Sequence, residues 1–313
     1  MRTVVFVGGT AFSGSTLLGM SLANDPTGFA VGEPHNHLQP TRPHHPNLVC
    51  ACGDKHCAVW QEVRKNGPDK LYETIFDLFP EVEFIVDSSK DPFWIRSQGR
   101  RLEQVGIRTK NLLIWKTPLE LAYSFKKRGK PEAWERAWVG YHRLYTSVVE
   151  DWKAIRYREY VEDPTVLETT CRYLQVPYTV DKARFWEKAH HVIGGNHSAK
   201  IHLYAEGTPR YESSVAKHGS IGEERIRETH RQVYYQSVND PELHNHVEER
   251  IRESALIGKI VGLLDARDIS RDTPAERVPS GIRLSGPAVR ARELRRALVL
   301  GIGSYRYGRS YPD

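Results

Sequence analysis

One stretch near the start of the chain constrains the fold more than any other. The apolar segment TVVFV, residues 3–7, runs into the loop GGTAFSGST and then into a helical pattern, and the loop has the spacing Gly9-x4-Gly14-Ser15-Thr16. A strand, a glycine-rich turn and a helix start in this order present backbone N–H groups to an anion, so the segment predicts a phosphate-binding loop. Ser15 stands where a nucleoside-triphosphate loop carries lysine, which disfavours an ATPase or a kinase.

The first 180 residues alternate between two kinds of pattern. Residues 83–87, 111–115 and 154–157 are short and apolar, like residues 3–7, and are typical of buried parallel strands. Helical patterns cover residues 15–23, 69–79, 92–105, 118–127, 134–152 and 164–174. This order predicts an α/β fold of the P-loop type, a doubly wound and mostly parallel sheet flanked by helices, with its site at the carboxyl ends of the strands.

The later part of the chain is predicted to be helical, most clearly over residues 223–238 and 241–264, where it covers the sheet or an acceptor cleft. We therefore expect a catalytic domain over residues 1–265 and a basic linker and tail over residues 266–313. The tail contains ten Arg and five Asp or Glu residues, which accounts for most of the formal charge of +6 and argues against nucleic acid as a partner. A short basic helix is expected over residues 289–300. Two roles stay open for it, contact with a membrane surface and packing against another subunit.

Three of the four cysteines lie close together, as Cys50, Cys52 and Cys57 in CACGDKHC, and they do not form a disulfide framework. A cytoplasmic location is the expectation from this cysteine usage. Two interpretations of the cluster stay open: a structural or redox-sensitive loop, and a zinc site with His45 or His56 as its fourth ligand. No run of eighteen apolar residues occurs in the chain, so no membrane span is predicted.

Several motifs together resemble the sulfotransferases that use 3'-phosphoadenosine 5'-phosphosulfate, and the tyrosylprotein and bacterial carbohydrate enzymes in particular. The resemblance covers residues 3 to 200 and rests on the Ser-Gly-Ser-Thr run of the loop, on KTPLELAYS after a strand, on SSKDPF after another strand, on GEPH and on GGNHSAK. In this family the loop holds a 5'-phosphosulfate, a group that has no γ-phosphate. The chain departs from the family at Phe12, where lysine or arginine is usual.

The resemblance implies roles for individual residues. The donor-binding residues would be Ser13, Gly14, Ser15, Thr16, Lys116, Ser124, Arg128 and Lys200. Lys116 and Ser124 would hold the 3'-phosphate, and Arg128 would supply a second cation. Glu33 would act as the general base and Lys90 would contact the sulfuryl group, while His35 and His37 remain alternative bases.

The implied reaction is sulfuryl transfer to a hydroxyl group, and it requires no metal. The acceptor stays open among a carbohydrate, a glycolipid and another small or peptidyl hydroxyl compound, and formation of a homodimer stays open as well. Two rival functions remain: a catalytically inactive nucleotide-binding protein, indicated by Phe12, and a P-loop kinase that takes its lysine from elsewhere.

Overall fold

The computed structural model describes residues 1–40, 45, 49–54, 56–204, 207–218 and 223–271. Within them, one sheet contains five parallel strands in the order β2-β3-β1-β4-β5. The strands are β1 (Thr3–Gly8), β2 (Gly28–Gly32), β3 (Phe84–Asp87), β4 (Arg108–Trp115) and β5 (Trp152–Arg156). The predicted α/β class with a doubly wound parallel sheet is therefore confirmed.

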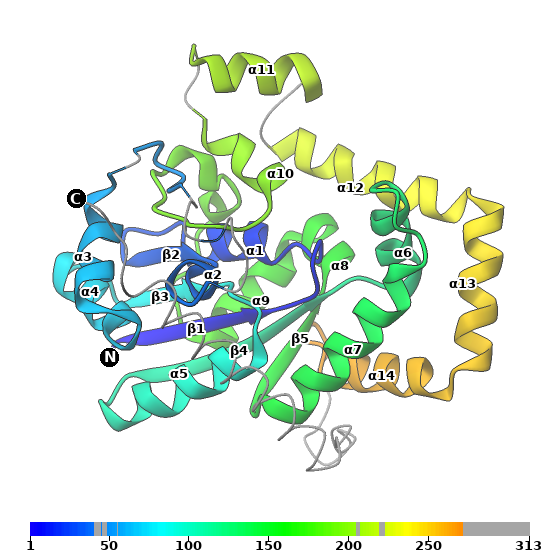
Figure 1. Cartoon of the computed structure of the whole chain (residues 1–313), viewed down its shortest axis with the longest axis horizontal. Coiled ribbons are helices and arrows are strands. Elements are labelled where there is room, and N and C mark those ends of the chain that lie inside the picture. The colour runs from blue at the N-terminus through cyan, green and yellow to red at the C-terminus, as the bar shows by residue number, and fades with distance from the viewer. Residues whose placement is uncertain (41–44, 46–48, 55, 205–206, 219–222, 272–313) are drawn as a thin grey trace.

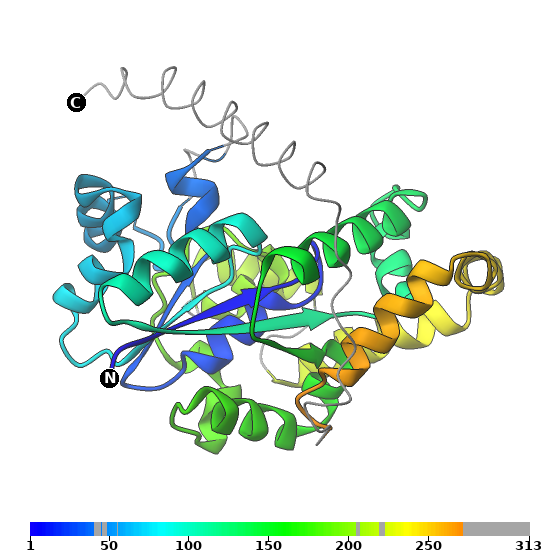
Figure 2. The same cartoon turned by 90° about the horizontal axis from the view of Figure 1, so that it is seen from below.

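Helices cover both faces of this sheet (Figures 1 and 2). The first part of the chain forms α1 (Ser15–Leu22), α2 (Pro34–Leu38), α3 (Ala58–Asn66), α4 (Leu71–Leu78), α5 (Pro92–Gln104), α6 (Pro118–Lys126) and α7 (Ala133–Val148). The second part forms α8 (Tyr157–Glu162), α9 (Pro164–Leu174), α10 (His197–Lys200), α11 (Pro209–His218), α12 (Glu223–Val238), α13 (Pro241–Glu253) and α14 (Ala255–Ala266). The alternation of strands and helices along the chain places the loops that follow the strands at one edge of the sheet.

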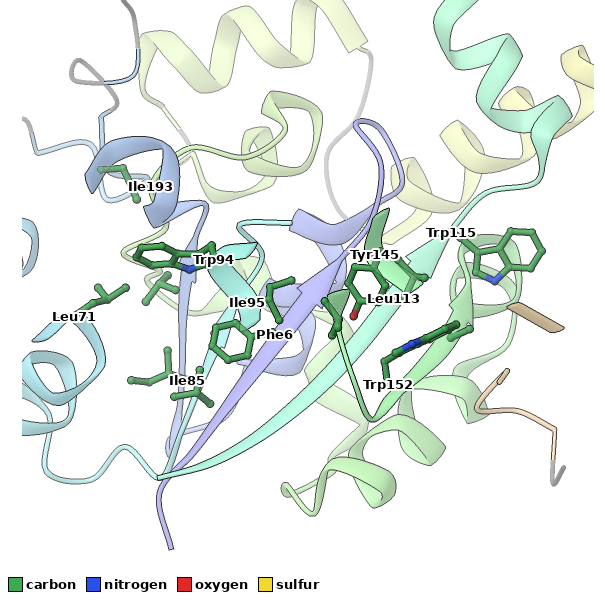
Figure 3. Packing of buried hydrophobic residues seen from close by; sticks show 14 of the residues in the cluster. Phe6, Leu71, Ile85, Trp94, Ile95, Leu113, Trp115, Tyr145, Trp152 and Ile193 are labelled. Carbon is green, nitrogen blue, oxygen red and sulfur yellow. The ribbon is translucent and has the colours of Figure 1, made fainter. Parts of the chain in front are cut away.

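Successive residues of each strand face opposite sides of the sheet, and each side has its own apolar cluster. Val4 and Phe6 pack with residues of α4, α5 and α7, whereas Val5 and Val7 pack with residues of α1 and α9. Figure 3 shows Phe6 beside Ile95 of α5 within the first cluster. Burial on both faces explains why the strands have continuous apolar sequences.

Side-chain caps fix the starts of the two helices that follow β3 and β4. The carboxylate of Asp91 accepts hydrogen bonds from the backbone N–H groups of Phe93 and Trp94 at the start of α5. Thr117 and Glu120 form a capping box at the start of α6. Both caps lie directly after a strand, so they set the direction in which the helix leaves the sheet.

The structure differs from the sequence-based element boundaries at several places. Strand β2 was not predicted, and the helix predicted over residues 134–152 ends at Val148, because β5 begins at Trp152. Tyr157, predicted as the end of a strand, is the first residue of α8. The pattern over residues 241–264 forms two helices with a break at Ser254, whose backbone is extended.

The helices α12, α13 and α14 follow one another along the side of the molecule on which β5 lies (Figure 1). Helix α12 packs against α6 and α8, and α14 packs against α7. After α14 the chain returns to β5, where the Ala154 N–H donates to the Arg267 carbonyl over 2.8 Å and the Ile269 N–H donates to the Ala154 carbonyl over 2.9 Å. The helix predicted over residues 289–300 lies outside the described residues.

None of the helices in the described part of the chain is long and apolar enough to cross a membrane.

Candidate functional site

A cavity of about 560 Å³ lies at the carboxyl ends of β1, β3 and β4, where the direction of chain winding reverses on either side of β1. Its wall combines the loop after β1, the loops after β3 and β4, the segment around α10, and one side of α12. Of the donor-site and catalytic residues predicted from the sequence, seven line this cavity: Gly14, Ser15, Thr16, Lys90, Lys116, Ser124 and Arg128.

The loop after β1 forms an open helix start. Gly14 has φ +99°, and a Cβ atom there would lie 2.3 Å from the ring of Tyr157, so both conformation and space require glycine. No side chain caps the first N–H groups of α1, and its first turn carries no acidic residue. Because these N–H groups carry the positive end of the helix dipole, they favour an anion in the cavity.

The loop after β4 and the helix α6 add cationic and hydroxyl groups. The Lys116 ammonium lies 4.5 Å from the centre of the Tyr157 ring, and burial is the main cause that lowers the pKa of Lys116 to about 8. Ser124, two turns into α6, donates its hydroxyl to the Glu120 carbonyl over 2.9 Å. A buried lysine in a cavity wall gains its full charge most easily when an anion binds beside it.

Arg128 lies one turn beyond Ser124, and two contacts hold its guanidinium. One is a hydrogen bond of 2.6 Å to the Ser124 carbonyl, and the other is the face of the Phe12 ring at 3.6 Å. Phe12 itself has φ +70°, a left-handed conformation that is uncommon for a bulky residue. The aromatic ring of Phe12 therefore contacts the Arg128 cation, which follows the end of α6, through its face.

Glu33 and Lys90 meet as an ion pair between the end of β2 and the loop after β3. Lys90 lines the cavity, and the buried Glu33 contacts Lys90 through one carboxylate oxygen. The other carboxylate oxygen of Glu33 lies 2.8 Å from the Asn36 amide nitrogen. Lys90 also has a left-handed backbone, with φ +67°. The pair thus places a carboxylate directly beside the cation that faces the cavity.

Tyr141 of α7 connects the loops after β1 and β3. Its hydroxyl accepts a hydrogen bond from the Gly9 N–H and donates one to the Lys90 carbonyl, both over 2.7 Å. Asp87 anchors the loop after β3, because its buried carboxylate accepts hydrogen bonds from the Tyr72 hydroxyl, the Trp94 indole and the Ser89 N–H. These contacts hold the two loops at a fixed separation.

Ser13, Lys200 and His37 are among the residues considered from the sequence that do not line the cavity. Ser13 is buried beneath the loop, and its hydroxyl has no hydrogen-bond partner among the described residues. Lys200 lines a second hollow together with Cys50 and Tyr204. His37 contacts the Arg64 guanidinium, and burial, the larger cause, lowers the pKa of His37 to about 4, which makes it a poor base at neutral pH.

Sequence reasoning missed His230, which reaches the cavity from α12. It is buried, neither ring nitrogen has a hydrogen-bond partner among the described residues, and its Nε2 lies 3.7 Å from a Glu162 carboxylate oxygen. Burial lowers the pKa of His230, so a neutral ring faces the cavity. The helical pattern of residues 223–238 gave no signal for this, because the loop and α12 are more than 200 residues apart in the sequence.

No protein-family model matches the chain, and no curated protein sequence matches it. Solved structures that are similar to it in fold include two sulfotransferase domains. A sulfotransferase domain from the curacin biosynthetic pathway aligns over 73% of this chain and 97% of its own length, with 18% sequence identity and a TM-score of 0.44. A sulfotransferase domain from the Synechococcus PCC 7002 olefin synthase aligns over 74% and 87% of the two chains, with 18% identity and a TM-score of 0.45.

Proposed function

We propose that the protein is a sulfotransferase that moves the sulfuryl group from 3'-phosphoadenosine 5'-phosphosulfate to a hydroxyl group of an acceptor. One observation carries the proposal: a single cavity joins an uncapped helix start, a group of cationic and hydroxyl side chains, and Lys90, which is paired with Glu33. The donor has a 5'-phosphosulfate and a separate 3'-phosphate, so it needs two anion sites and a reactive centre.

The loop Ser13–Thr16 and the N–H groups of α1 would hold the 5'-phosphosulfate in this proposal. Lys116, Ser124 and Arg128 would surround the 3'-phosphate, where a cation and a hydroxyl on one phosphate form charge-assisted hydrogen bonds. Lysine in place of the family's arginine gives up bidentate contact with that phosphate. The partly buried Arg128 guanidinium, held over Phe12, supplies such a planar fork instead.

Glu33 and Lys90 would carry the chemistry. The acceptor oxygen attacks sulfur and forms the new S–O bond, while the bond between sulfur and the bridging phosphate oxygen breaks and releases 3',5'-adenosine bisphosphate. Glu33 takes the proton of the acceptor hydroxyl, and Lys90 with the loop amides stabilises the charge that develops on the departing phosphate. The ion pair holds the two groups side by side in the free protein.

The surroundings of Asp87 support this proposal over a kinase. A P-loop kinase needs a carboxylate near the phosphates to hold magnesium. Asp87 ends β3, the strand beside β1, but hydrogen bonds from Tyr72, Trp94 and Ser89 occupy its carboxylate. A magnesium ion there would have to displace three buried donors.

Calorimetric titration with 3',5'-adenosine bisphosphate, and separately with ATP and magnesium, tests the proposal. We expect tight binding of the bisphosphate, weak binding of magnesium-ATP, and loss of bisphosphate binding in the double variant Lys116→Ala, Ser124→Ala. Lys200→Ala is the matched control, because Lys200 lies outside the cavity wall and its removal should leave the affinity unchanged.

Each other outcome of the titration has a definite meaning. Preference for magnesium-ATP would overturn the proposal in favour of a kinase, and binding of neither ligand would overturn it altogether. Tight bisphosphate binding without sulfuryl transfer to any of a panel of sugars, glycolipids, tyrosyl peptides and phenols would indicate the catalytically inactive nucleotide-binding protein. The acceptor class itself is read from the same panel.

A further inference from the structure

A second group of reactive side chains lies outside the cavity, between the loop before α3 and the segment before α10. The sulfur atoms of Cys50, Cys52 and Cys57 and a ring nitrogen of His191 all lie within 4.8 Å of one another. The His191 Nδ1 atom is 3.3 Å from the Cys57 sulfur and 3.8 Å from the Cys50 sulfur. Three thiol sulfurs and one imidazole nitrogen therefore lie close enough together to bind one metal ion.

These separations match a tetrahedral metal site. Zinc–sulfur bonds of about 2.3 Å and zinc–nitrogen bonds of about 2.0–2.1 Å place tetrahedral S and N ligand atoms roughly 3.6 Å apart. The two sulfur–nitrogen distances of 3.3 Å and 3.8 Å lie on either side of that value. Only a small adjustment of the side chains would bring all four atoms to bonding distance of one ion.

We propose that Cys50, Cys52, Cys57 and His191 bind one zinc ion. Three thiolates and an imidazole form a closed ligand set, which is the arrangement of structural zinc sites. The fourth ligand differs from both histidines considered from the sequence, because the group found among the described residues contains His191 in place of His45 or His56. Binding as thiolates releases the three thiol protons to solvent.

The surroundings of the four ligands are built to hold them in place. The His191 ring stacks on the Phe29 ring with an interplanar angle of 5°, and its carbonyl accepts a hydrogen bond of 2.8 Å from the Trp60 indole. The Ala51 N–H donates to the Val192 carbonyl over 2.9 Å, so the backbones of the two ligand segments are joined directly.

The zinc site would act on the cavity through the chain that follows His191. The Ile193 N–H donates to the Val31 carbonyl over 3.1 Å, and the Glu33 N–H donates to the Ile193 carbonyl over 2.7 Å. Three residues later the Asn196 N–H donates to the Thr16 hydroxyl over 3.0 Å. One short segment therefore connects the metal ligands to the candidate base and to the phosphate loop, so the metal would position both.

The test measures metal content on the full-length protein, purified under reducing conditions without an affinity tag that binds metals. We expect about one zinc per chain by elemental analysis, and cobalt(II) substitution should give the visible bands of a tetrahedral site with sulfur-to-cobalt charge transfer. Cys52→Ser changes an exposed ligand. Loss of an outer-shell partner lowers metal affinity roughly 10- to 100-fold, and we expect Cys52→Ser to lower zinc affinity by at least that factor. His56→Ala is the matched control from the same loop and should retain the metal.

Hydrogen exchange then tests the connection to the cavity. Removal of zinc with a chelator should raise amide exchange in peptides that contain Glu33 and Ile193, with little change in peptides from α9. Three results would overturn the proposal: a metal-free chain with four free thiols that takes up neither zinc nor cobalt, a disulfide between two of the three clustered cysteines, or zinc that both Cys52→Ser and His191→Asn retain. Since the wild-type metal content and cobalt spectrum stand on their own, a variant that fails to fold leaves the test intact.

Discussion

The charge of Lys116 depends on pH within the range in which the protein can be studied. Its pKa is lowered to about 8, mainly by burial, so the free protein loses the ammonium as the pH rises through that value. The proposed 3'-phosphate ligand is fully ionised above its second pKa of about 6 and prefers the protonated lysine. We expect bisphosphate affinity to be constant near pH 7 and to weaken by up to about tenfold per pH unit above pH 8.

Calorimetry between pH 7 and pH 9.5 measures this dependence. The variant Lys116→Arg keeps its charge throughout and should give a flat profile over the same range. A wild-type profile that is equally flat would mean that Lys116 does not contact the bound phosphate.

Glu33 offers a second test at the scale of one residue. In Glu33→Gln the side chain can still accept a hydrogen bond from Lys90, but it can no longer take a proton. We expect kcat for sulfuryl transfer to fall by about 10² to 10⁴, while the dissociation constant of the bisphosphate changes little. Steady-state kinetics with an acceptor found in the panel measures the first quantity and calorimetry the second; an unchanged kcat would assign the base role to another group.

Among the elements, α7 holds the site together through one hydroxyl. Tyr141 joins the N–H of Gly9 to the carbonyl of Lys90, so Tyr141→Phe removes the hydrogen-bond partner of two partly buried backbone groups. We expect the free energy of unfolding to fall by about 1–3 kcal/mol. Bisphosphate affinity should fall as well, because the loops after β1 and β3 lose their common anchor.

Urea unfolding and calorimetry check this prediction, with Tyr235→Phe on α12 as the control because that tyrosine is largely exposed. Equal effects of the two variants, or a Tyr141→Phe protein with wild-type stability and affinity, would contradict the role assigned to Tyr141.

The elements also show what the sequence could and could not predict. Local patterns were sufficient for β1, β3, β4 and the start of α6, because apolar runs, glycines and prolines act over a few residues. Strand β2 was not predicted because its sequence, GFAVG, is short and has glycine at both ends, which weakens a strand pattern. The end of α7 was misplaced because Val149 and Trp152 continue the helical spacing of apolar residues, although Asp151 turns the chain there with φ +46°.

The site was predictable to the extent that its residues follow strands. The positions of Lys90 and Lys116 at the cavity follow from the carboxyl ends of β3 and β4. His191 joins the cysteine cluster, and His230 joins the cavity wall, from segments more than 100 residues away in the sequence. These contacts depend on how α12 and the segment before α10 pack, and no local sequence pattern indicates that packing. The same holds for the contact of Phe12 with Arg128.

For the molecule as a whole, the segment just after α14 provides a test of the domain boundary. Truncation after Arg271 keeps the hydrogen bonds of Arg267 and Ile269 with β5, and truncation after Asp265 removes them. Two backbone hydrogen bonds and one buried isoleucine together contribute about 3 kcal/mol. We expect the longer chain to keep the full free energy of unfolding and the shorter one to lose about that amount.

Urea unfolding of the two truncated chains and of the full chain measures the difference. If both truncated chains match the full chain, the catalytic unit ends at residue 265 as predicted from composition. If both are destabilised, residues beyond 271 contribute to the fold.

At each outer strand of the sheet, a neighbouring segment pairs with one residue of the exposed edge. Ile193 lies against the end of β2, and Asp268 lies against β5, each through a single parallel bridge. An open strand edge can recruit strands from neighbouring molecules, and these two bridges occupy outward-facing hydrogen-bonding groups at one position of each outer strand. A sheet continued from one molecule into the next would therefore first have to displace Ile193 or Asp268.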